Sequence, residues 1–421
     1  MDAPLNTLIE SKKRPLGDSS DSQMPGGTLC AKIPLSPTTR QRILFMAPLP
    51  PPMHGLSLAA QVLLDELRER HDVDVVDTAK QRPKGLVDRL KRFVDVGGFL
   101  SQVLRYRGRA DAIYLTISQS FLGNMKDIAI YLLCFRQLDK MFIHLHGGAG
   151  MARILQGRSR LWAGINRFFI RRLRGVIVLG QTHHALFDGI ADPAKMHIVP
   201  NFAEDHLFID EADVEKKFRD RGPIKLLFLS NLIYGKGHEE LLDAYLALDK
   251  PRRSKFVLNL AGGFKSETAK QEFLRRIEGH EDIVYHGIVH GQEKKRLFNE
   301  SRVFCLPTYY PYEGQPISIL EAYASGCAVM TTDHSGIGDV FSSPQNGYEV
   351  DKRSPASILK TLEEIADDPG ELLSCAERNY HEAILKYRTT IYNESLLRIF
   401  ESEPGVRQAT VTQAEFKKYA A

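Results

Sequence analysis

Cysteine is scarce in this sequence, and the cysteines that occur form no motif. Five cysteines are spread over 421 residues, at positions 30, 134, 305, 327 and 375, and no two of them form a CxxC pair. A disulfide framework or a zinc site would need cysteines at short, regular spacings. We therefore expect reduced and mostly buried thiols, as in a cytosolic protein.

Long apolar runs are also missing. The best candidate, Ile128 to Phe135, is far shorter than the roughly 20 residues that cross a bilayer. Residues 1–40 mix Ser, Pro, Gly and charges without the apolar stretch of a secretory signal, so we expect a disordered tail there. The expected location is cytoplasmic, including peripheral contact with the inner face of the cell membrane.

The sequence has no convincing cluster of metal ligands. Asp72-Val73-Asp74 has the form of a metal-binding motif, but it flanks a strand of the interior type, and His183-His184 has no acidic or cysteine partner nearby in sequence. We therefore expect no metal and no organic cofactor. No recognisable nucleic-acid-binding module accompanies the basic residues, so nucleic acid is not an expected partner.

Positive charge is concentrated in the first half of the chain. The formal net charge is +4, but residues 41–205 carry 23 Lys and Arg against 15 Asp and Glu, whereas residues 206–421 carry 28 against 33. A basic N-terminal half joined to a mildly acidic C-terminal half suggests two lobes with different partners.

Short apolar runs alternate with helical patterns along the chain. Runs typical of buried parallel strands occur at 42–47, 73–76, 112–116, 141–145, 175–179, 197–199, 225–230, 256–261, 283–285, 303–306, 328–331 and 348–350. Strand and helix in alternation predict an α/β protein with two doubly wound, Rossmann-like parallel-sheet domains that face each other across a cleft. Ligands of such sheets bind at the carboxyl ends of the strands.

The strand pattern also predicts domain limits. We expect an N-terminal domain over residues 41–205, a linker over 206–223 and a C-terminal domain over 224–385. The natural boundary is Gly222-Pro223, where the pattern restarts. Residues 386–421 are expected to hold a C-terminal helix that crosses back, followed by a tail.

One stretch places two glutamates eight positions apart around a helix start. Pro316 suits the first turn, so a helix is predicted from near Pro316 to Ala324, with Glu313 before it and Glu321 inside it. Unpaired N–H groups at the helix start favour an anion, and with the two carboxylates they suit a phosphorylated sugar. Paired acids for glycoside hydrolysis, or a surface helix with a glutamate at each end, are the alternatives.

Three further glycine-containing loops follow predicted strands. Gly55 opens a helix after the first strand, and His146 ends the fourth strand beside flexible glycines. Lys236 stands between two glycines in the loop that begins with Ser230-Asn231, where it could hold a diphosphate as a point charge. The alternatives are a plain strand-to-helix turn at Gly55, a structural role for His146 and a solvated surface lysine at position 236.

Two segments combine arginines with large apolar residues. Residues 151–175 contain seven arginines and no acid, and residues 82–109 are also basic and amphipathic. Such segments are typical of helices at an anionic membrane surface or of sites for anionic acceptors. A solvated outer face of the N-terminal domain is the alternative.

From about Arg42 to Glu401 the sequence resembles the family 4 glycosyltransferases, which have the two-domain GT-B fold and retain anomeric configuration. The resemblance is strongest from Lys225 to Val350. There the family signature of a Glu, seven residues and a second Glu lies within Pro307 to Gly326, with the flanking Glu-Gly-x-Pro and Leu-Glu-Ala. His54-Gly55 and the prolines before it look like the bacterial polysaccharide-assembly members.

The resemblance implies roles for the residues of these loops. Glu313 would contact the donor sugar, and Glu321 would bind the ribose hydroxyls of the nucleotide. Lys236 would hold the donor diphosphate, and His146 would face the donor sugar. The implied site also includes segments near the donor sugar and phosphates, namely Gly55, Gly314, Gln315, Pro316 and Ile317, and the segment Val199-Pro200-Asn201 that closes the N-terminal domain.

One position departs from the family. Asn231 stands where the family usually has arginine, so the diphosphate clamp lacks one cation unless another arginine replaces it. The resemblance implies a retaining, metal-independent glycosyltransferase that moves a hexose from a UDP- or GDP-sugar. The acceptor would be a lipid-linked oligosaccharide or a polysaccharide of the cell surface. A GT-B epimerase or phosphorylase, and a catalytically silent GT-B binding or scaffold protein, are the alternatives.

Overall fold

The computed structural model describes residues 40–51, 53–79, 86–157 and 159–402, and it leaves the side chains of residues 86–96 undescribed. The expected tail at residues 1–39 and the chain after residue 402 lie outside the described residues. So do residues 82–85 and Arg158 of the two basic segments.

The first half of the chain forms a six-stranded parallel sheet with the order β2-β1-β3-β4-β5-β6. Its strands are β1 (Arg42–Ala47), β2 (Asp72–Asp77), β3 (Ala112–Thr116), β4 (Met141–Leu145), β5 (Gly175–Val178) and β6 (Met196–Ile198). Nearly every residue of the four central strands is buried. This explains why apolar runs rather than alternating patterns revealed them.

The second half forms another parallel sheet, with the order β12-β11-β10-β7-β8-β9. Its strands are β7 (Ile224–Leu229), β8 (Phe256–Ala261), β9 (Ile283–Tyr285), β10 (Val303–Leu306), β11 (Ala328–Thr331) and β12 (Gly347–Glu349). The predicted fold is confirmed, and each predicted strand lies within one residue of the observed bounds.

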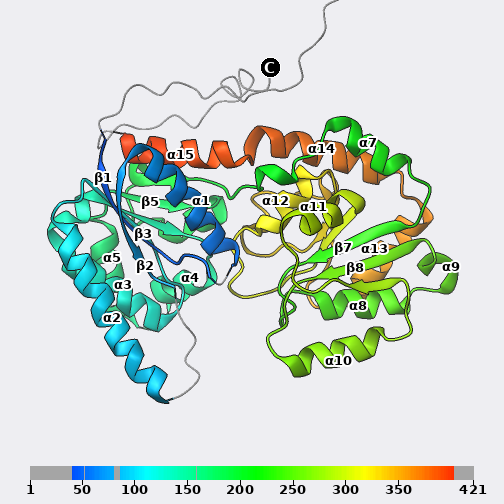
Figure 1. Cartoon of the computed structure of the whole chain (residues 1–421), viewed down its shortest axis with the longest axis horizontal. Helices are drawn as coiled ribbons and strands as arrows, with labels where there is room; N and C mark the ends of the chain where they lie inside the picture. The colour runs from blue at the N-terminus through cyan, green and yellow to red at the C-terminus, as the bar shows by residue number, and fades with distance from the viewer. Residues whose placement is uncertain (1–39, 52, 80–85, 158, 403–421) are drawn as a thin grey trace, which may run out of the picture. The chain divides into compact units, whose positions relative to one another are not determined.

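Helices cover both faces of the first sheet (Figure 1). They are α1 (Gly55–Arg70), α2 (Leu86–Arg107), α3 (Phe121–Leu133), α4 (Ala149–Gln156), α5 (Arg160–Ile170) and the short α6 (Gln181–His184). Alternate residues of β1 face opposite sides of the sheet. Leu44 and Met46 belong to the core beside α3 and α5. Ile43 and Phe45 belong to the core beside α1.

The second sheet is surrounded by α8 (His238–Ala247), α9 (Lys250–Arg253), α10 (Glu267–Ile277), α11 (Gly291–Glu300), α12 (Ile317–Ala324), α13 (Pro355–Asp367) and α14 (Glu371–Lys386). Residues 206–223 contain α7 (Glu211–Arg219). The amphipathic α7 buries Val214 and inserts Lys217, whose Nζ donates to the carbonyl oxygen of Ser325 at 2.5 Å. This bond helps to satisfy the last carbonyls of α12.

The last described helix, α15 (Thr389–Glu401), packs on α1 at the first sheet (Figure 1). The core beside α1 is completed by Leu396, Leu397 and Phe400. The ring of Phe400 packs edge-on against that of Tyr114 on β3, with the ring centres 5.9 Å apart. Arg174 Nη2 donates to the carbonyl oxygen of Ser402 at 2.6 Å. The end of the described chain is therefore fixed to the sheet formed by its beginning.

Two sequence expectations concern thiols and membrane spans. The thiols of Cys134, Cys305, Cys327 and Cys375 are free and buried, which confirms that expectation for the described cysteines. Among the helices that the structure describes, none is both long enough and apolar enough to cross a membrane.

Candidate functional site

The strand order of the second sheet brings two of the predicted loops together. Its order reverses between β7 and β10, which are neighbours, and such switch points form crevices at the carboxyl ends of the strands. Lys236 follows β7 and Glu313 follows β10. Lys236 Nζ donates to Glu313 Oε2 at 2.6 Å, and the Thr308 hydroxyl donates to the same oxygen at 3.1 Å.

Both members of this pair are largely withdrawn from water. The Lys236 side chain is 13% exposed and that of Glu313 is 9% exposed. The ammonium also lies 5.1 Å from the centre of the Tyr310 ring, within the range of a cation–π contact. The solvated lysine that was the alternative for this position is therefore not what the structure shows.

Two glycines shape the lysine loop. Gly235 and Gly237 have φ values of +92° and +86°, which L side chains rarely adopt. A Cβ at Gly237 would also lie 2.2 Å from the carbonyl oxygen of Pro307, and the Tyr309 N–H donates to the Gly235 carbonyl at 2.7 Å. The loop therefore lies directly against the chain that leaves β10, which holds Lys236 beside Glu313.

The Glu313 loop in turn lies on the His146 loop. A Cβ at Gly314 would be 2.1 Å from the carbonyl oxygen of His146, so only glycine permits this approach. On its other side, the Ser335 hydroxyl donates to the Glu313 carbonyl at 2.8 Å, and the Gly336 N–H donates to the Gly314 carbonyl at 3.1 Å. Sequence reasoning did not find this supporting segment, because nothing in its residue types marks it.

Gln315 joins the loop to the segment that follows β6. The Asn201 N–H donates to Gln315 Oε1 at 2.7 Å, and Asn201 Nδ2 donates to the Gln315 carbonyl at 2.8 Å. Gln315 Nε2 donates to the carbonyl of Leu179 at 3.3 Å. The Gln315 side chain and its backbone carbonyl thus link the loops of the two sheets.

The helix after this loop is α12, and its predicted extent is confirmed. Pro316 is its N-cap rather than part of its first turn, and no side chain caps its first N–H groups. Gly55 lies at this helix end, since a Cβ built on it would be 3.5 Å from Ile317 Cδ1. The preceding His54 caps α1: its Nδ1 accepts from the Ser57 N–H at 3.1 Å.

His146 is half-buried and lies beside two fully buried histidines, His144 and His183. The ring of His144 is 3.9 Å from that of His146, and His144 Nδ1 is 2.8 Å from the Tyr114 hydroxyl. Burial, with a smaller contribution from nearby His183, lowers the pKa of His146 to about 3. His146 is therefore uncharged at neutral pH, so it can exchange hydrogen bonds with a ligand but adds no positive charge.

His183 is a candidate that sequence reasoning passed over. Its fully buried ring lies between two loop glycines, 3.1 Å from a Cβ built on Gly148 and 2.6 Å from one built on Gly336. Within the described part of the chain, neither ring nitrogen has a hydrogen-bond partner. Burial lowers the pKa of His183 too, although Asp339 opposes the shift. Its sequence context, a short helix after β5, gives no functional signal.

Glu321 is 2% exposed and carries its own ion pair. Lys294 Nζ on α11 donates to Glu321 Oε1 at 2.6 Å and to Glu204 Oε2 at 2.8 Å. Burial raises the pKa of Glu321, and Lys294 opposes that rise. Burial also disfavours the charged form of Lys294, but the two carboxylates outweigh it and raise the pKa of Lys294. Sequence reasoning missed Lys294 because it is one of several charged residues in a polar helix.

Asn231 is in the same loop as Lys236, after β7, but unlike Lys236 it is exposed. Its Oδ1 is 4.0 Å from a Cβ built on Gly263 in the loop after β8. No group of three or more His, Cys, Asp or Glu side chains in the described ranges is arranged to hold a metal ion.

Comparisons with known proteins give a family match for part of the second half of the chain and a fold match for most of the chain. Residues 210–382 match the family model of the glycosyl transferases group 1. The chain is 22% identical over 269 residues to the uncharacterized glycosyltransferase MJ1069 of Methanocaldococcus jannaschii, covering 59% of this chain and 64% of that protein. It is 25% identical over 182 residues to the N,N'-diacetylbacillosaminyl-diphospho-undecaprenol alpha-1,3-N-acetylgalactosaminyltransferase of Campylobacter jejuni, covering 43% and 45%.

These matches are partial, since the chain spans between 36% and 64% of the length of the first curated relatives that it matches. A crystal structure of Anabaena Alr3699/HepE in complex with UDP-glucose is similar with a TM-score of 0.64 at 16% identity, over 86% of this chain and 100% of that chain. Residues 210–382 are therefore similar to the group 1 glycosyltransferases, and the two parallel sheets of the chain form the GT-B fold.

Proposed function

We propose that this protein is a retaining glycosyltransferase that moves a hexose from a UDP- or GDP-sugar to a lipid-linked or polysaccharide acceptor. The observation that carries the proposal is the buried Lys236–Glu313 pair, at the switch point of the second sheet and in backbone contact with His146. The family match and the UDP-glucose bound by the similar Anabaena protein support a nucleotide-sugar donor.

The chemistry of the donor assigns a task to each side chain. When the sugar leaves, negative charge grows on the nucleoside diphosphate, and the Lys236 ammonium with the uncapped N–H groups of α12 would stabilise it. Glu313 would bind hydroxyls of the transferred sugar through its carboxylate. Neutral His146 would hydrogen-bond the sugar from the side of the first sheet. In this proposal the protein supplies the charge that other transferases take from a metal.

Retention of configuration follows from where the acceptor enters. The acceptor hydroxyl would attack the anomeric carbon from the face that the diphosphate leaves, and its proton would pass to the departing phosphate oxygen. Water must be kept out, because it would hydrolyse the same donor. Loops from both sheets already meet through Gly314 and Gln315, so a bound donor would lie between groups fixed to both.

The test begins with a screen of nucleotide sugars. A donor that binds the folded protein raises its thermal unfolding midpoint, so a shift identifies the nucleotide and the sugar. Transfer is then measured with that donor and a lipid-linked acceptor, and the configuration of the new bond is read by NMR. We expect transfer with the anomeric configuration of the donor; an inverted product would contradict the proposal.

The silent binding protein is the second candidate, because Asn231 removes a cation that the family usually places in this loop. Its discriminating result is donor binding without transfer or donor hydrolysis. An arginine restored by Asn231→Arg would then be expected to leave the protein inactive. If the protein is an enzyme, the same variant should instead lower the donor KM, because it adds a positive charge near the diphosphate.

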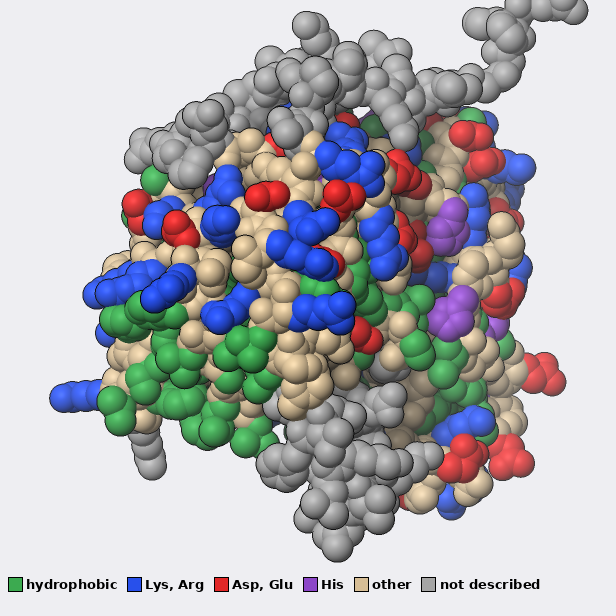
Figure 2. All heavy atoms as spheres, turned by 60° about the vertical axis from the view of Figure 1, so that its left-hand side comes forward, with side chains coloured by type: hydrophobic (Ala, Val, Ile, Leu, Met, Phe, Trp, Pro, Cys, Tyr) green, Lys and Arg blue, Asp and Glu red, His purple; other side chains and the backbone are tan. Residues whose placement is uncertain are grey.

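We also propose that the enzyme works at the membrane surface. Large apolar side chains are exposed on α3, on the turn after it and on α5, namely Phe121, Leu122, Met125, Leu132, Phe135, Leu161 and Phe168. We call these seven residues the apolar face. On the side of the molecule that Figure 2 brings forward, hydrophobic side chains gather beside Lys and Arg side chains.

Arginines from residues 151–175 border the apolar face. Arg160 is exposed at the start of α5, and the Arg172 guanidinium lies 3.6 Å from the centre of the Phe168 ring. Apolar side chains that enter the acyl boundary beside cations that meet anionic headgroups are typical of peripheral membrane binding. The Campylobacter relative is named for an undecaprenol-linked acceptor, which supports an acceptor held in a membrane.

A further inference from the structure

We propose that Lys294 is a positioning residue for the nucleotide end of the donor, because it holds the Glu321 carboxylate in place and ties it to Glu204. The inference rests on the proposed function in one respect, namely that Glu321 binds the ribose. Lys294 is on a different helix from Glu321 and is not among the residues that the family resemblance identified.

Lys294, Glu321 and Glu204 form a triad around one ammonium group. Lys294 Nζ donates to Glu321 at 2.6 Å and to Glu204 at 2.8 Å. The side chains of Lys294, Glu321 and Glu204 are 12%, 3% and 27% exposed, so Lys294 and Glu321 are largely withdrawn from water and Glu204 is half-buried. Two carboxylates share one ammonium, and therefore each limits how strongly Lys294 holds the other.

The electrostatic consequence concerns the charge state of Glu321. Among the described groups, the charges that act on this carboxyl are the favourable Lys294 and the unfavourable Glu204, while burial itself disfavours ionisation. A carboxylate accepts hydrogen bonds from two vicinal ribose hydroxyls, whereas a protonated carboxyl gives up part of that capacity. Without Lys294, the pKa of Glu321 should rise further and ribose binding should weaken first at low pH.

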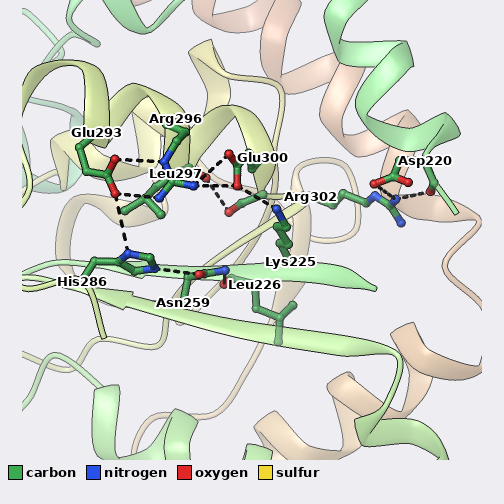
Figure 3. A network of polar contacts seen from close by, with 11 residues as sticks. Asp220, Lys225, Leu226, Asn259, His286, Glu293, Arg296, Leu297, Glu300 and Arg302 are labelled. Atoms are coloured by element: carbon green, nitrogen blue, oxygen red, sulfur yellow. Dashed lines mark hydrogen bonds and ion pairs between the residues drawn. The ribbon is translucent and has the colours of Figure 1, made fainter. Parts of the chain in front are cut away.

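Helix α11 is itself held firmly, which is why Lys294 can position another residue. On the side of the helix shown in Figure 3, Arg296 bridges Glu293 at 2.7 Å and Glu300 at 3.0 Å. Glu300 then accepts from Lys225 of β7 at 2.8 Å, and His286 at the end of β9 is 2.9 Å from Asn259 of β8. The Lys225–Glu300 contact ties α11 to β7, whereas the Arg296 bridges lie within the helix and the His286 contact joins the end of β9 to β8.

The other end of the triad reaches the connection between the two sheets. Glu204 follows the segment of Asn201, whose bonds to Gln315 join that connection to the Glu313 loop. Glu204 also precedes the short 3-10 turn Asp205–Leu207, which packs on α11. One ammonium therefore connects the proposed ribose contact to the segment that links the sheets.

Binding of UDP between pH 5.5 and 8.5, measured by calorimetry with GDP in parallel, tests the inference. We expect Lys294→Met to weaken binding about tenfold at pH 7, with a larger loss at pH 6 and a smaller one at pH 8.5. Lys294→Arg keeps the charge and should restore most of the affinity. Lys295→Met, at the next position of the same helix, is the matched control and should bind as the parent does.

Two further comparisons separate positioning from simple damage. Glu204→Gln leaves Lys294 to Glu321 alone, so it should bind UDP at least as tightly as the parent and lose less affinity at low pH. The parent should also prefer UDP over 2′,3′-dideoxy-UDP, and Lys294→Met should lose most of that preference. A merely structural lysine would weaken both ligands equally.

The outcomes distinguish this inference from the function on which it rests. If Glu321→Ala left UDP binding and ribose preference unchanged, the proposed role of Glu321 would be wrong. If Glu321→Ala abolished the preference but Lys294→Met bound both ligands as the parent does at every pH, the inference about Lys294 would be overturned while the proposed function stood.

Discussion

Lys236 and Glu313 carry charges that are compensated only while both are present. Their shared hydrogen bond is 2.6 Å long and lies in a largely buried place, where an unpaired charge costs several kcal/mol. The Thr308 hydroxyl and the Tyr310 ring fix the two side chains from either side. The protein itself therefore holds both side chains in place, as the donor site proposed above requires.

Gly314 offers a sharp test at the residue scale. A Cβ at this position would lie 2.1 Å from the His146 carbonyl oxygen. This oxygen belongs to the backbone, so it cannot move aside by a rotamer change as a side-chain atom can. We expect Gly314→Ala to push the Glu313 loop away from His146 and to lower kcat/KM by about a hundredfold, in line with the effect of misplacing a reacting group by about 1 Å. The measurement is steady-state transfer with the donor found in the screen.

The matched control is Gly164→Ala on α5, where a Cβ would meet nothing within 4 Å. Alanine is the better helix former by about 1 kcal/mol, so this variant should be at least as stable as the parent and fully active. Equal activity of the Gly314 and Gly164 variants would contradict the close contact between the two loops.

At the scale of elements, the sequence revealed strands well and pairings poorly. The strands are runs of buried apolar residues such as Ile143 and Val329, so their limits follow from local composition. The supporting contacts join residues far apart in the chain: Asn201 bonds to Gln315, 114 positions away, and Lys294 to Glu321, 27 positions away. Local patterns contain no information about which of many polar residues will meet across such distances.

The same limit explains why some single-residue interpretations were incomplete. Glu313 and Lys236 could be identified because glycines and a helix start surround them. His183 could not, because its environment consists of two glycines that approach it from other loops. The helix α7 escaped notice because its few apolar residues are surrounded by charges, although Val214 is buried.

The apolar face predicts a measurable property of α3 and α5. Leu122 and Leu161 are 76% and 77% exposed, and burying two leucines in a bilayer contributes about 1.5–3 kcal/mol each. We expect the double variant Leu122→Asp, Leu161→Asp to bind vesicles containing phosphatidylglycerol at least about tenfold more weakly than the parent. The measurement is co-sedimentation with vesicles.

Leu274→Asp, on α10 beside the second sheet, is the control and should bind as the parent does. Parent binding should also weaken when salt is raised, because cations attract the anionic headgroups. Binding that survives both leucine changes and charge reversal of Arg160 and Arg172 would rule out this surface.

At the scale of the whole molecule, the two sheets share more than a chain connection. Gly314 contacts His146, Gln315 bonds to Asn201, and Asp339 accepts from the Thr182 N–H at 3.1 Å. The helix α15 returns from the second sheet to complete a core of the first. Buried histidines lie among these connections, so protonation of those histidines should affect the stability of the whole fold.

The direction of that effect follows from linkage. Burial lowers the pKa values of His144, His146 and His183 in the folded state below the ordinary value of 6.5. Below pH 6.5 the unfolded chain therefore binds protons that the folded chain does not bind, and the free energy of unfolding falls. Each histidine contributes at most about 1.4 kcal/mol per pH unit between 6.5 and its folded pKa.

Denaturant unfolding between pH 7 and pH 5 checks this expectation. The free energy of unfolding should fall as the pH is lowered. For His183→Asn this free energy should fall less steeply with pH than for the parent. Gln181→Asn, at an exposed position of the same short helix, removes no titratable group and is the control, since it should keep the slope of the parent. Identical slopes for all three proteins would show that His183 does not titrate in the way its burial implies.

If Lys236 and Glu313 form the donor site that we propose, a single substitution of either residue should abolish most of the donor turnover. Lys236→Ala and Glu313→Ala should each lower the kcat/KM for release of the nucleoside diphosphate by at least about a hundredfold. Lys360→Ala and Glu364→Ala remove an exposed pair on α13 and should match the parent. Parent-like turnover in both the Lys236 and Glu313 variants would contradict the account.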